Sequence, residues 1–336
     1  MPLHDETHDD IRKTPQTWLV TGSAGFIGSH LVETLLRLEQ RVVGLDDLSA
    51  CGRKNLDHLN AVLPPDIWNR FMFIKGDVRD PESCAAACKG VDFVLHHAAI
   101  GSVPRSLEDP VNVDRVNVGG FVTMLSAAAA QGVKRFVYAS SSAVYGDSGA
   151  RPNREDQPLA PQSPYAAGKY ANELYAATLG THQGLETIGL RYFNIYGPRQ
   201  DPDGAYAAVI PKWVTSLRTG VPVTIHGDGE TIRDFCHVDD AVRANILAAT
   251  TRNANAINRV YNIASGQKTS LNALFALLRE QAAPGAMPLY GPERPGDIKI
   301  SQAAIDQAAE FLGFRPAVSL ESGLRSLLTC HEAPHG

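Results

Sequence analysis

Short apolar runs alternate with helical stretches through the first 194 residues, and this alternation limits the possible folds more than any other feature. Helical segments are predicted between the runs, for example at 26–38 and 116–131. Near-continuous apolar strands separated by helices indicate a doubly wound parallel α/β sheet of the Rossmann type, covered on both faces. The predicted strands are TWLVTG (17–22), RVVGLD (41–46), FMFIKGD (71–77), VDFVLHHAA (91–99), RFVYASS (135–141) and ETIGLRYF (186–193).

The composition narrows the class of protein. The chain has 336 residues, enough for one large or two closely joined domains, and its net charge of −5 is not the basic footprint of a nucleic-acid-binding protein. No apolar run approaches the ~20 residues of a membrane helix, and we do not expect the polar start MPLHDETHDDIRK to be a signal or transit peptide. Five scattered cysteines without a C-x-x-C motif are typical of reduced thiols. We therefore expect a cytoplasmic protein without a metal site, a nucleic-acid partner or a membrane segment.

A glycine-rich loop follows the first predicted strand directly. In TGSAGFIGSH, Gly22, Gly25 and Gly28 let the backbone turn tightly and approach a pyrophosphate at the N-terminus of the next helix. The second strand ends in Asp46, whose carboxylate can accept hydrogen bonds from ribose hydroxyls and would repel a 2′-phosphate. This combination predicts a site for NAD rather than NADP. The alternative is a structural turn that binds nothing.

Further candidate cofactor contacts follow later strands. Asp77 ends the third strand, where an adenine ring would lie. Ala98 and Ala99 follow the fourth strand and are small enough for the cofactor backbone to come close. All of these positions are at the carboxyl ends of strands, where open parallel sheets bind ligands.

After Phe193 the alternation gives way to mixed helix, strand and turn signals, which indicates a smaller mixed α/β domain. We predict a flexible arm at 1–15 and an NAD-binding domain at 16–194 with a returning segment at about 235–264. The substrate domain is predicted at 195–234 and 265–336, and the segment 49–69 is predicted to be a long loop.

The segment SPYAAGKYANELYA (163–176) places Tyr165 and Lys169 one helical turn apart, on the same face. An ammonium beside a phenol lowers the pKa of the tyrosine, which suits proton transfer near neutral pH. Ser140, Ser141 and Ser142 end the fifth strand, and we expect their hydroxyls at the same edge as the cofactor. A hydroxyl, a phenol beside a cation and a nicotinamide site together predict hydride transfer at a carbinol carbon.

These motifs resemble the extended short-chain dehydrogenase/reductase family. The glycine loop, the set Ser141, Tyr165 and Lys169, and the run RYFNIYGPRQ (191–200) carry the resemblance, which extends from about residue 15 to 328. Within the family the chain is similar to nucleotide-sugar 4-epimerases. It is most similar to the bacterial subgroup that acts on UDP-N-acetylhexosamines, whose members have an N-terminal arm and a segment like GSVPRS (101–106).

The resemblance implies a role for each matching residue. Ser141 and the adjacent Ser142 would bond the sugar 4-hydroxyl. Tyr165 would be the general base, and Lys169 would also hold the nicotinamide ribose. The implied NAD contacts are Gly22, Gly25, Phe26, Ile27, Gly28, Asp46, Asp47, Asp77, Val78, Ala98, Ala99, Asn117, Tyr165, Lys169 and Tyr192. The implied UDP-sugar contacts are Ser102, Ser141, Ser142, Tyr165, Asn194, Arg233, Arg294, Asp297 and Ser301.

Among the substrate contacts, Arg233 and Arg294 would hold the UDP diphosphate and Asp297 the uridine ribose. Ser301, small at a position that borders the sugar C2 substituent in the family, would admit an acetamido group. Two purely structural interpretations remain open. Arg233 and Asp234 could form a surface ion pair, and Tyr192 and Phe193 could be aromatic residues of the core.

The implied activity is NAD-dependent conversion of UDP-GlcNAc to UDP-GalNAc through a transient 4-keto sugar, with NAD tightly bound and regenerated at each turnover. Dehydrating relatives carry an Asp-Glu pair where this chain has Ser142 and Ala143, so dehydration is not expected. The alternatives are a UDP-glucose or UDP-glucuronate 4-epimerase and a non-catalytic NAD-binding regulator. The resemblance further implies a homodimer, formed through the helices at 116–131 and 165–179, and a place in surface polysaccharide biosynthesis.

Overall fold

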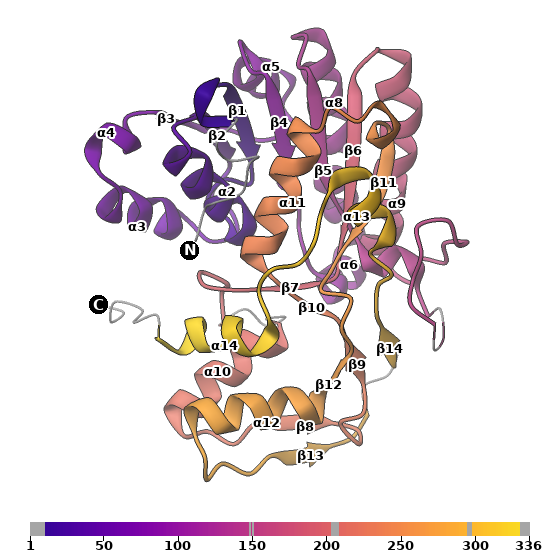
Figure 1. Cartoon of the computed structure of the whole chain (residues 1–336). Coiled ribbons are helices and arrows are strands. Elements are labelled where there is room, and N and C mark those ends of the chain that lie inside the picture. Colours follow the sequence, from indigo (N-terminus) through magenta and orange to yellow (C-terminus); the bar gives the residue numbers. More distant parts are fainter. Residues whose placement is uncertain (1–10, 148, 150, 203–207, 294–297, 330–336) are drawn as a thin grey trace.

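The computed structural model describes residues 11–147, 149, 151–202, 208–293 and 298–329. A parallel sheet of seven strands forms its centre, in the order β11-β6-β5-β4-β1-β2-β3 (Figure 1). The strand order reverses between β1 and β4, which makes the carboxyl ends of these strands a place where ligands bind in open α/β sheets. The strands are β1 (Thr17–Thr21), β2 (Arg41–Asp46), β3 (Phe71–Lys75), β4 (Phe93–His96), β5 (Arg135–Ser141), β6 (Glu186–Tyr192) and β11 (Arg259–Ile263). The predicted doubly wound fold is confirmed.

Helices cover both faces of the sheet. The first face carries α2 (Phe26–Arg37), α11 (Val238–Thr250) and α13 (Asp306–Leu312), and the second carries α5 (Pro81–Cys88), α8 (Gly120–Ala130) and α9 (Pro164–Tyr175). On the first face α2 buries Leu31 and Leu35 completely, and each such side chain contributes roughly 2 kcal/mol. In Figure 1, α11 lies in front of the strands. α13 packs on β11, although it belongs to the chain segment predicted as the substrate domain.

The segment 49–69 is not a loop, so that prediction was wrong. It contains α3 (Lys54–Val62) and the short α4 (Pro65–Trp68). Leu56 and Leu59 of α3 are fully buried, and Pro65 occupies the first turn of α4, where proline is well tolerated. Two buried leucines three residues apart are a weak helical signal, and only packing against α2 and α4 reveals it.

The end of the predicted arm is anchored. Ile11 is buried in the core of the first sheet face, and its carbonyl accepts a hydrogen bond from Gln40 Nε2 at 3.1 Å. Gln40 also accepts from the backbone N–H of Gln16 and from the indole of Trp18. The chain therefore packs against the sheet before residue 15. Residues 1–10 lie outside the described residues.

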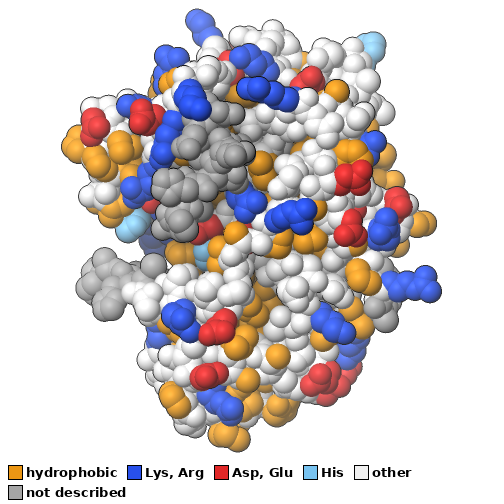
Figure 2. All heavy atoms as spheres, viewed as in Figure 1, with side chains coloured by type: hydrophobic (Ala, Val, Ile, Leu, Met, Phe, Trp, Pro, Cys, Tyr) orange, Lys and Arg blue, Asp and Glu red, His pale blue; other side chains and the backbone are white. Residues whose placement is uncertain are grey.

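A smaller body lies below the sheet in Figure 1. Its core contains Trp213, Phe275 and Leu278, and Figure 2 shows apolar, basic and acidic side chains interspersed on its surface. Its elements are α10 (Val209–Thr219), α12 (Leu271–Ala282), α14 (Leu320–Thr329) and short strands in two small sheets: β9 (Ile232–Arg233) with β12 (Thr269–Ser270) and β14 (Ile300–Ser301), and β8 (Thr224–His226) with β13 (Leu289–Gly291). The pair β7 (Asn194–Tyr196) and β10 (Phe235–His237) leads into it from the sheet.

The remaining described elements are short. They are α6 (Val103–Glu108), α7 (Pro110–Asp114), η1 (Arg115–Gly119), η2 (Ser142–Tyr145), η3 (Ala176–Gly180) and η4 (Ala254–Ala256). Within the described ranges, no helix is long and apolar enough to cross a membrane. The domain boundaries predicted from the sequence stay a prediction.

Candidate active site

The glycine-rich loop passes close to neighbouring backbone. Gly22 adopts a left-handed φ of 67°, and a Cβ there would lie 2.8 Å from the nitrogen of Ala98. A Cβ on Gly28 would overlap the carbonyl oxygen of Gly22, so α2 can approach the loop only without a side chain there. Phe26 and Ile27 open α2, whose N-terminus has no side-chain cap among the described residues. The partial positive charge of this helix end and the close backbone fit the pyrophosphate of NAD.

Asp46 lies at the end of β2, beside the glycine loop. Its carboxylate accepts hydrogen bonds from the backbone N–H groups of Ala24 at 2.9 Å and Leu48 at 2.8 Å. Burial raises the pKa of Asp46, and these two donors partly oppose that rise. Asp47 accepts from the N–H and the hydroxyl of Ser49, at 2.9 and 2.6 Å. Asp46 is thus the carboxylate adjoining the loop, and its contact with the ribose remains a prediction.

The next two strand ends carry the other predicted cofactor residues. Asp77 follows β3 and accepts from the guanidinium of Arg79, with Nε at 3.0 and 2.9 Å from the two oxygens. These hydrogen bonds hold the pKa of Asp77 below its usual range. Val78 is buried, whereas Ala98 and Ala99, which follow β4, are partly exposed. Their contacts with NAD remain predictions.

Asn117 is buried in the π-helical turn η1 and holds the loop that follows β4. Its Oδ1 accepts from the N–H of Ile100 at 2.7 Å, and its Nδ2 donates to the carbonyl of Ile100 at 3.1 Å. Its own carbonyl accepts from Asn172 Nδ2 of α9 at 2.9 Å. Asn117 therefore links α9 to the cofactor side of the sheet.

The hydroxyl, phenol and amine of the predicted catalytic set are brought together. Ser141 ends β5, and its side chain is hydrogen-bonded to that of Tyr165 near the start of α9. Lys169 Nζ lies 5.9 Å from the centre of the Tyr165 ring and donates to the carbonyl of Ala139 at 2.8 Å. Ser163 caps α9 by accepting from the N–H of Ala166 at 3.2 Å, which fixes where the helix begins.

The pKa of Tyr165 moves in the direction opposite to our prediction. Burial raises the pKa of Tyr165, and the hydrogen bond with Ser141 lowers it by less. Burial also lowers the pKa of Lys169 to about 8. The predicted lowering of the Tyr165 pKa was wrong, because desolvation of the phenolate dominates.

The three serines at the end of β5 do not share one environment. Ser140 is buried, and its hydroxyl donates to Glu173 Oε1 at 2.5 Å, so the prediction of three hydroxyls at one edge was wrong for this residue. Successive strand residues face opposite sides, and this alternation separates Ser140 from Ser141. Ser141 Oγ accepts from the N–H of Ala143 at 3.2 Å, and Ser142 opens η2, partly exposed.

Tyr192 and Phe193 are buried, as the core interpretation requires. The hydroxyl of Tyr192 accepts from Asn245 Nδ2 at 2.6 Å, and its ring stacks on His97 with 5.8 Å between centroids. Phe193 packs near the ring of Tyr145, at 6.2 Å. The predicted contact of Tyr192 with the nicotinamide remains a prediction.

On the substrate side, two predicted residues meet across a short parallel pairing. Ser301 of β14 lies opposite Arg233 of β9, although they are far apart in sequence. Arg233 Nη1 donates to the carbonyl of Ile298 at 2.6 Å. Asn194 Nδ2 donates to the carbonyl of Asp234 at 3.2 Å, which places Asn194 beside the same strand.

The interpretation of Arg233 and Asp234 as a surface ion pair was wrong, because the side chain of Asp234 is fully buried. Its carboxylate accepts from the N–H groups of Ser265 (2.9 Å), Gly266 (3.1 Å) and Ala303 (3.2 Å) and from the hydroxyl of Ser265 (2.7 Å). These bonds tie β9 and β10 to the segments that follow β11 and β14. Asp234 therefore sets the position of its neighbours on the substrate side.

Three further predicted substrate residues have different outcomes. Ser102 is the N-cap of α6 and accepts from the N–H of Arg105 at 3.2 Å, a structural role. Arg294 and Asp297 lie outside the described residues.

Sequence reasoning missed the polar groups behind the site. Glu173 and Arg191 form a buried ion pair, with Nη2 at 2.8 Å from Oε2, and Asp234 makes the contacts given above. A signal was available for one of them. Arg191 stands inside ETIGLRYF, a run expected to be buried on both faces, and a buried guanidinium requires a buried acidic partner.

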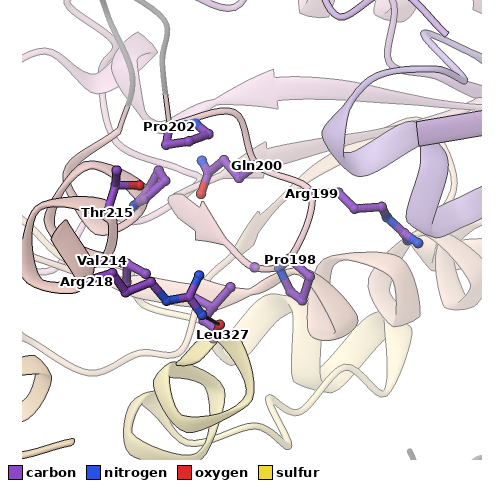
Figure 3. A pocket seen from close by; sticks show the side chains of 10 residues that line it. Pro198, Arg199, Gln200, Pro202, Val214, Thr215, Arg218 and Leu327 are labelled. Carbon is purple, nitrogen blue, oxygen red and sulfur yellow. Dashed lines mark hydrogen bonds between the residues drawn. The ribbon is translucent and has the colours of Figure 1, made fainter. Parts of the chain in front are cut away.

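A small cavity of about 30 Å³, room for one water, lies away from these residues. The loop after β7, α10 and α14 line it, through residues that include Pro198, Gln200, Val214 and Leu327. Figure 3 shows Arg199 extending away from the other lining side chains, and its Nη1 donates to Glu33 Oε2 of α2 at 2.7 Å. The cavity is too small to hold a cofactor or substrate.

The chain is similar to known proteins over nearly its whole length. A UDP-glucose 4-epimerase of Mycolicibacterium smegmatis is 37% identical over 308 residues, which cover 91% of this chain and 95% of that protein. A dTDP-glucose 4,6-dehydratase of Streptomyces griseus is 40% identical over 311 residues, 91% of each chain. Among solved structures, the UDP-N-acetylglucosamine 4-epimerase of Methanobrevibacter ruminantium in complex with UDP-N-acetylmuramic acid has a TM-score of 0.86 at 36% identity, over 94% of this chain and 97% of that one.

The model of the family described as "NAD dependent epimerase/dehydratase family" matches residues 18–264. This range includes the glycine loop, the strand ends beside it and the contact between Ser141 and Tyr165. Because the match spans most of the chain and the relatives align over nearly all of it, the chain belongs to the NAD dependent epimerase/dehydratase family, with NAD as its cofactor.

Proposed function

We propose that this protein inverts C4 of a UDP-N-acetylhexosamine, converting UDP-GlcNAc to UDP-GalNAc with a tightly held NAD. The observation that carries the proposal is the meeting of Ser141, Tyr165 and Lys169: Lys169 Nζ lies 5.9 Å from the centre of the phenol ring and is bonded to the carbonyl of Ala139, two residues before Ser141. This set lies at the carboxyl ends of the strands that also carry the glycine loop, where hydride transfer and proton transfer can occur together.

The NAD would be held by the loop Gly22–Gly28, the carboxylate of Asp46 and the start of α2. The chemistry that bound NAD would supply is reversible hydride transfer at C4 of the sugar. The overall reaction therefore needs no external oxidant.

The chain's own groups move the proton. Tyr165 takes the proton of the sugar 4-hydroxyl, directly or through Ser141, and later returns it. Because burial raises the pKa of Tyr165, the phenolate needs a nearby positive charge, and Lys169 is placed to supply it. With its pKa lowered to about 8, Lys169 still carries its charge for most of the time at neutral pH.

The substrate would be anchored at its UDP end. Arg233 adjoins Ser301 through the pairing of β9 and β14, so a diphosphate and the sugar C2 substituent would be read side by side. A serine leaves room for an acetamido group, and this supports an N-acetylated substrate. The second candidate is a UDP-glucose or UDP-glucuronate 4-epimerase, which the same proton and hydride chemistry would serve.

Dehydration is disfavoured by the residues at the start of η2. Elimination of water requires an acid and a base beside the hydroxyl that leaves. Ser142 and Ala143 occupy the positions where dehydrating relatives carry an Asp-Glu pair, and neither side chain can act as a carboxylic acid. The similarity to a dTDP-glucose 4,6-dehydratase therefore does not extend to this pair.

The test is incubation of the purified protein with UDP-GlcNAc without an added hydride donor, followed by proton NMR of the anomeric signals. Formation of UDP-GalNAc, reduced at least 100-fold in Tyr165→Phe, is the expected result. Conversion of UDP-glucose or UDP-glucuronate alone would keep the chemistry and overturn the substrate. Loss of the C6 hydroxymethyl signals would identify dehydration instead.

The predicted homodimer has a specific surface to form on. α6, α7 and α9 pack together and expose Leu107, Val111, Leu174 and Tyr175, with 64%, 61%, 52% and 42% of their surfaces accessible. Large exposed apolar side chains on adjacent helices are typical of a protein interface. α8 instead buries Phe121, Met124 and Leu125 and carries none of the exposed large apolar side chains, so we place the interface on α6, α7 and α9. Leu107→Asp together with Leu174→Asp should yield a monomer in sedimentation, and an unchanged dimer would exclude this surface.

A cytoplasmic location and a role in supplying polysaccharide precursors fit the proposal.

A further inference from the structure

The strongest unassigned feature is a set of contacts between α9 and β5 beneath the catalytic set. Tyr165, Lys169 and Glu173 follow one another at intervals of four residues, so they share one face of α9. Each of the three side chains contacts one of the last three residues of β5, which are 139–141. Tyr165 bonds Ser141, Lys169 donates to the carbonyl of Ala139 at 2.8 Å, and Glu173 accepts from Ser140 at 2.5 Å.

Glu173 is in turn held from the neighbouring strand. Arg191 of β6 donates to both of its oxygens, Nε to Oε1 at 2.9 Å and Nη2 to Oε2 at 2.8 Å. Only 5% of the Arg191 side chain and 6% of the Glu173 side chain are exposed. The guanidinium and the carboxylate are both planar, so this bidentate pair fixes their relative orientation as well as their distance.

Arg191 is itself fixed on its other side. Its Nη1 donates to the hydroxyl of Tyr145 at 2.8 Å, and that hydroxyl donates to Asn262 Oδ1 at 2.7 Å. Tyr145 belongs to η2, which begins at Ser142, and Asn262 belongs to β11. The contacts therefore join β5, β6, β11, η2 and α9 around one buried charge pair.

A buried ion pair is often replaceable by apolar residues without loss of stability, so stability alone does not explain this arrangement. What the pair does fix is the rotation of α9 about its axis and its height along β5. A rotation of α9 by a small angle would separate the phenol of Tyr165 from Ser141, since Tyr165 lies on the same helix face as Glu173 whereas Ser141 belongs to β5. The geometry thus couples a buried carboxylate to the reacting group two turns away.

We propose that Glu173, held by Arg191 and Ser140, is a positioning residue that sets α9 so that Tyr165 meets Ser141. Glu173 does not touch the substrate in this arrangement and acts through Tyr165. The measurements of kcat rest on the proposed function, whereas the NMR titration of Tyr165 does not.

The first experiment compares Ser140→Ala with Tyr261→Phe in the full-length protein. Each removes one buried hydroxyl that donates a hydrogen bond, to Glu173 in the first case and to the carbonyl of Ala256 at 3.0 Å in the second, at the far edge of the same sheet. We expect Ser140→Ala to lower kcat about tenfold with KM changed less than twofold, and Tyr261→Phe to leave both unchanged. Equal kcat values for the two variants would overturn the proposal.

The second experiment separates position from stability. Glu173→Gln leaves the guanidinium of Arg191 buried without its counter-ion, and we expect Tm and kcat to fall together. In the double variant Glu173→Gln with Arg191→Met, neither charge of the pair remains, so Tm should recover while kcat stays low. Recovery of kcat along with Tm would show a merely structural pair and contradict the proposal.

The third measurement needs no turnover. In protein labelled with ¹³C at the tyrosine ring, the Tyr165 signal is assigned by its loss in Tyr165→Phe, and its pH titration is followed by NMR. Lys169 on α9 and Ser141 on β5 face this phenol, and loss of the Ser141 contact should raise the pKa of Tyr165. We expect the titration of Tyr165 to move to higher pH in Ser140→Ala and not in Tyr261→Phe, and an unmoved titration contradicts the proposal. If the wild type turns over none of the UDP-sugars, the proposed function fails, while this titration still tests the position of α9.

Discussion

The predicted cofactor side, around the glycine loop, and the predicted substrate side, around Asp234, are built by different means. Around the glycine loop the closest approaches are between backbone atoms: Gly22 lies against Ala98, and Gly28 against Gly22. The strands of the sheet are four to seven residues long. On the substrate side, β9, β12 and β14 have two residues each, and the geometry depends on the side chain of Asp234. A backbone cradle tolerates little change, whereas a site built of side chains on short strands can change its ligand and keep its fold.

The largest effect should follow from Gly28→Ala, on the cofactor side. The added Cβ would overlap the carbonyl oxygen of Gly22, so α2 must move away from the loop. We expect the free energy of unfolding to fall by about 3 kcal/mol and the NAD content of the purified protein to fall at least tenfold. The control is Gly285→Ala, where the added Cβ meets nothing within 4 Å. Similar NAD contents in the two variants would show that the close backbone contact at Gly28 is not needed to hold NAD.

Lys169→Met should stabilise the NAD-free protein, because this side chain is 4% exposed and burial lowers the pKa of Lys169 from 10.5 to about 8. Between these two values the unfolded chain binds more protons than the folded protein, so this residue makes stability rise with pH. Below pH 8 it contributes a constant penalty of about 3 kcal/mol, offset by about 1 kcal/mol from its hydrogen bond to Ala139.

We therefore expect Lys169→Met to raise the free energy of unfolding at pH 7 by about 2 kcal/mol. It should also flatten the rise in stability between pH 8 and 10.5. Urea unfolding over this pH range measures both effects. A variant less stable than wild type at pH 7 would mean that Lys169 is not under electrostatic strain.

Asp234→Asn should weaken the substrate side alone. The amide replaces one acceptor oxygen by an NH2 group that faces backbone N–H donors, so the segments carrying Ser265 and Ala303 lose a fixed partner. We expect KM for the UDP-sugar to rise about tenfold, which is about 1.4 kcal/mol, with unchanged NAD content. Asp306→Asn, at an exposed position, is the control. A loss of NAD in Asp234→Asn would show that the two sides are not separate.

Ser301→Tyr should have the smallest effect on the fold and change only the choice of substrate. Ser301 is partly exposed in the two-residue strand β14, so a larger side chain can project from it. We expect turnover of N-acetylated UDP-sugars to fall about tenfold while that of UDP-glucose is preserved, as measured by NMR with both substrates. An equal loss for both substrates would refute the role of Ser301 in reading the C2 substituent.

The two sides also differ in how well the sequence predicts them. The strands Thr17–Thr21 and Arg41–Asp46, the loop between Gly22 and Gly28 and the helix face shared by Tyr165 and Lys169 all follow from spacing within short windows. Such patterns report burial and turn geometry, which are local properties. The pairing of Ser301 with Arg233 joins two-residue strands, and so short a strand has no periodicity from which to predict a partner.

What the sequence alone determined is the doubly wound sheet, the glycine-rich loop after β1 and the helix face that Tyr165 and Lys169 share. What only the tertiary structure decided is the environment of those groups: the rise in the pKa of Tyr165, the helices within 49–69, and the engagement of Ser140 by Glu173 and Arg191. The physical reason is that periodicity encodes which side of an element is buried. Desolvation and the partners of buried charges depend on which distant elements meet there, and that is settled only when the chain packs.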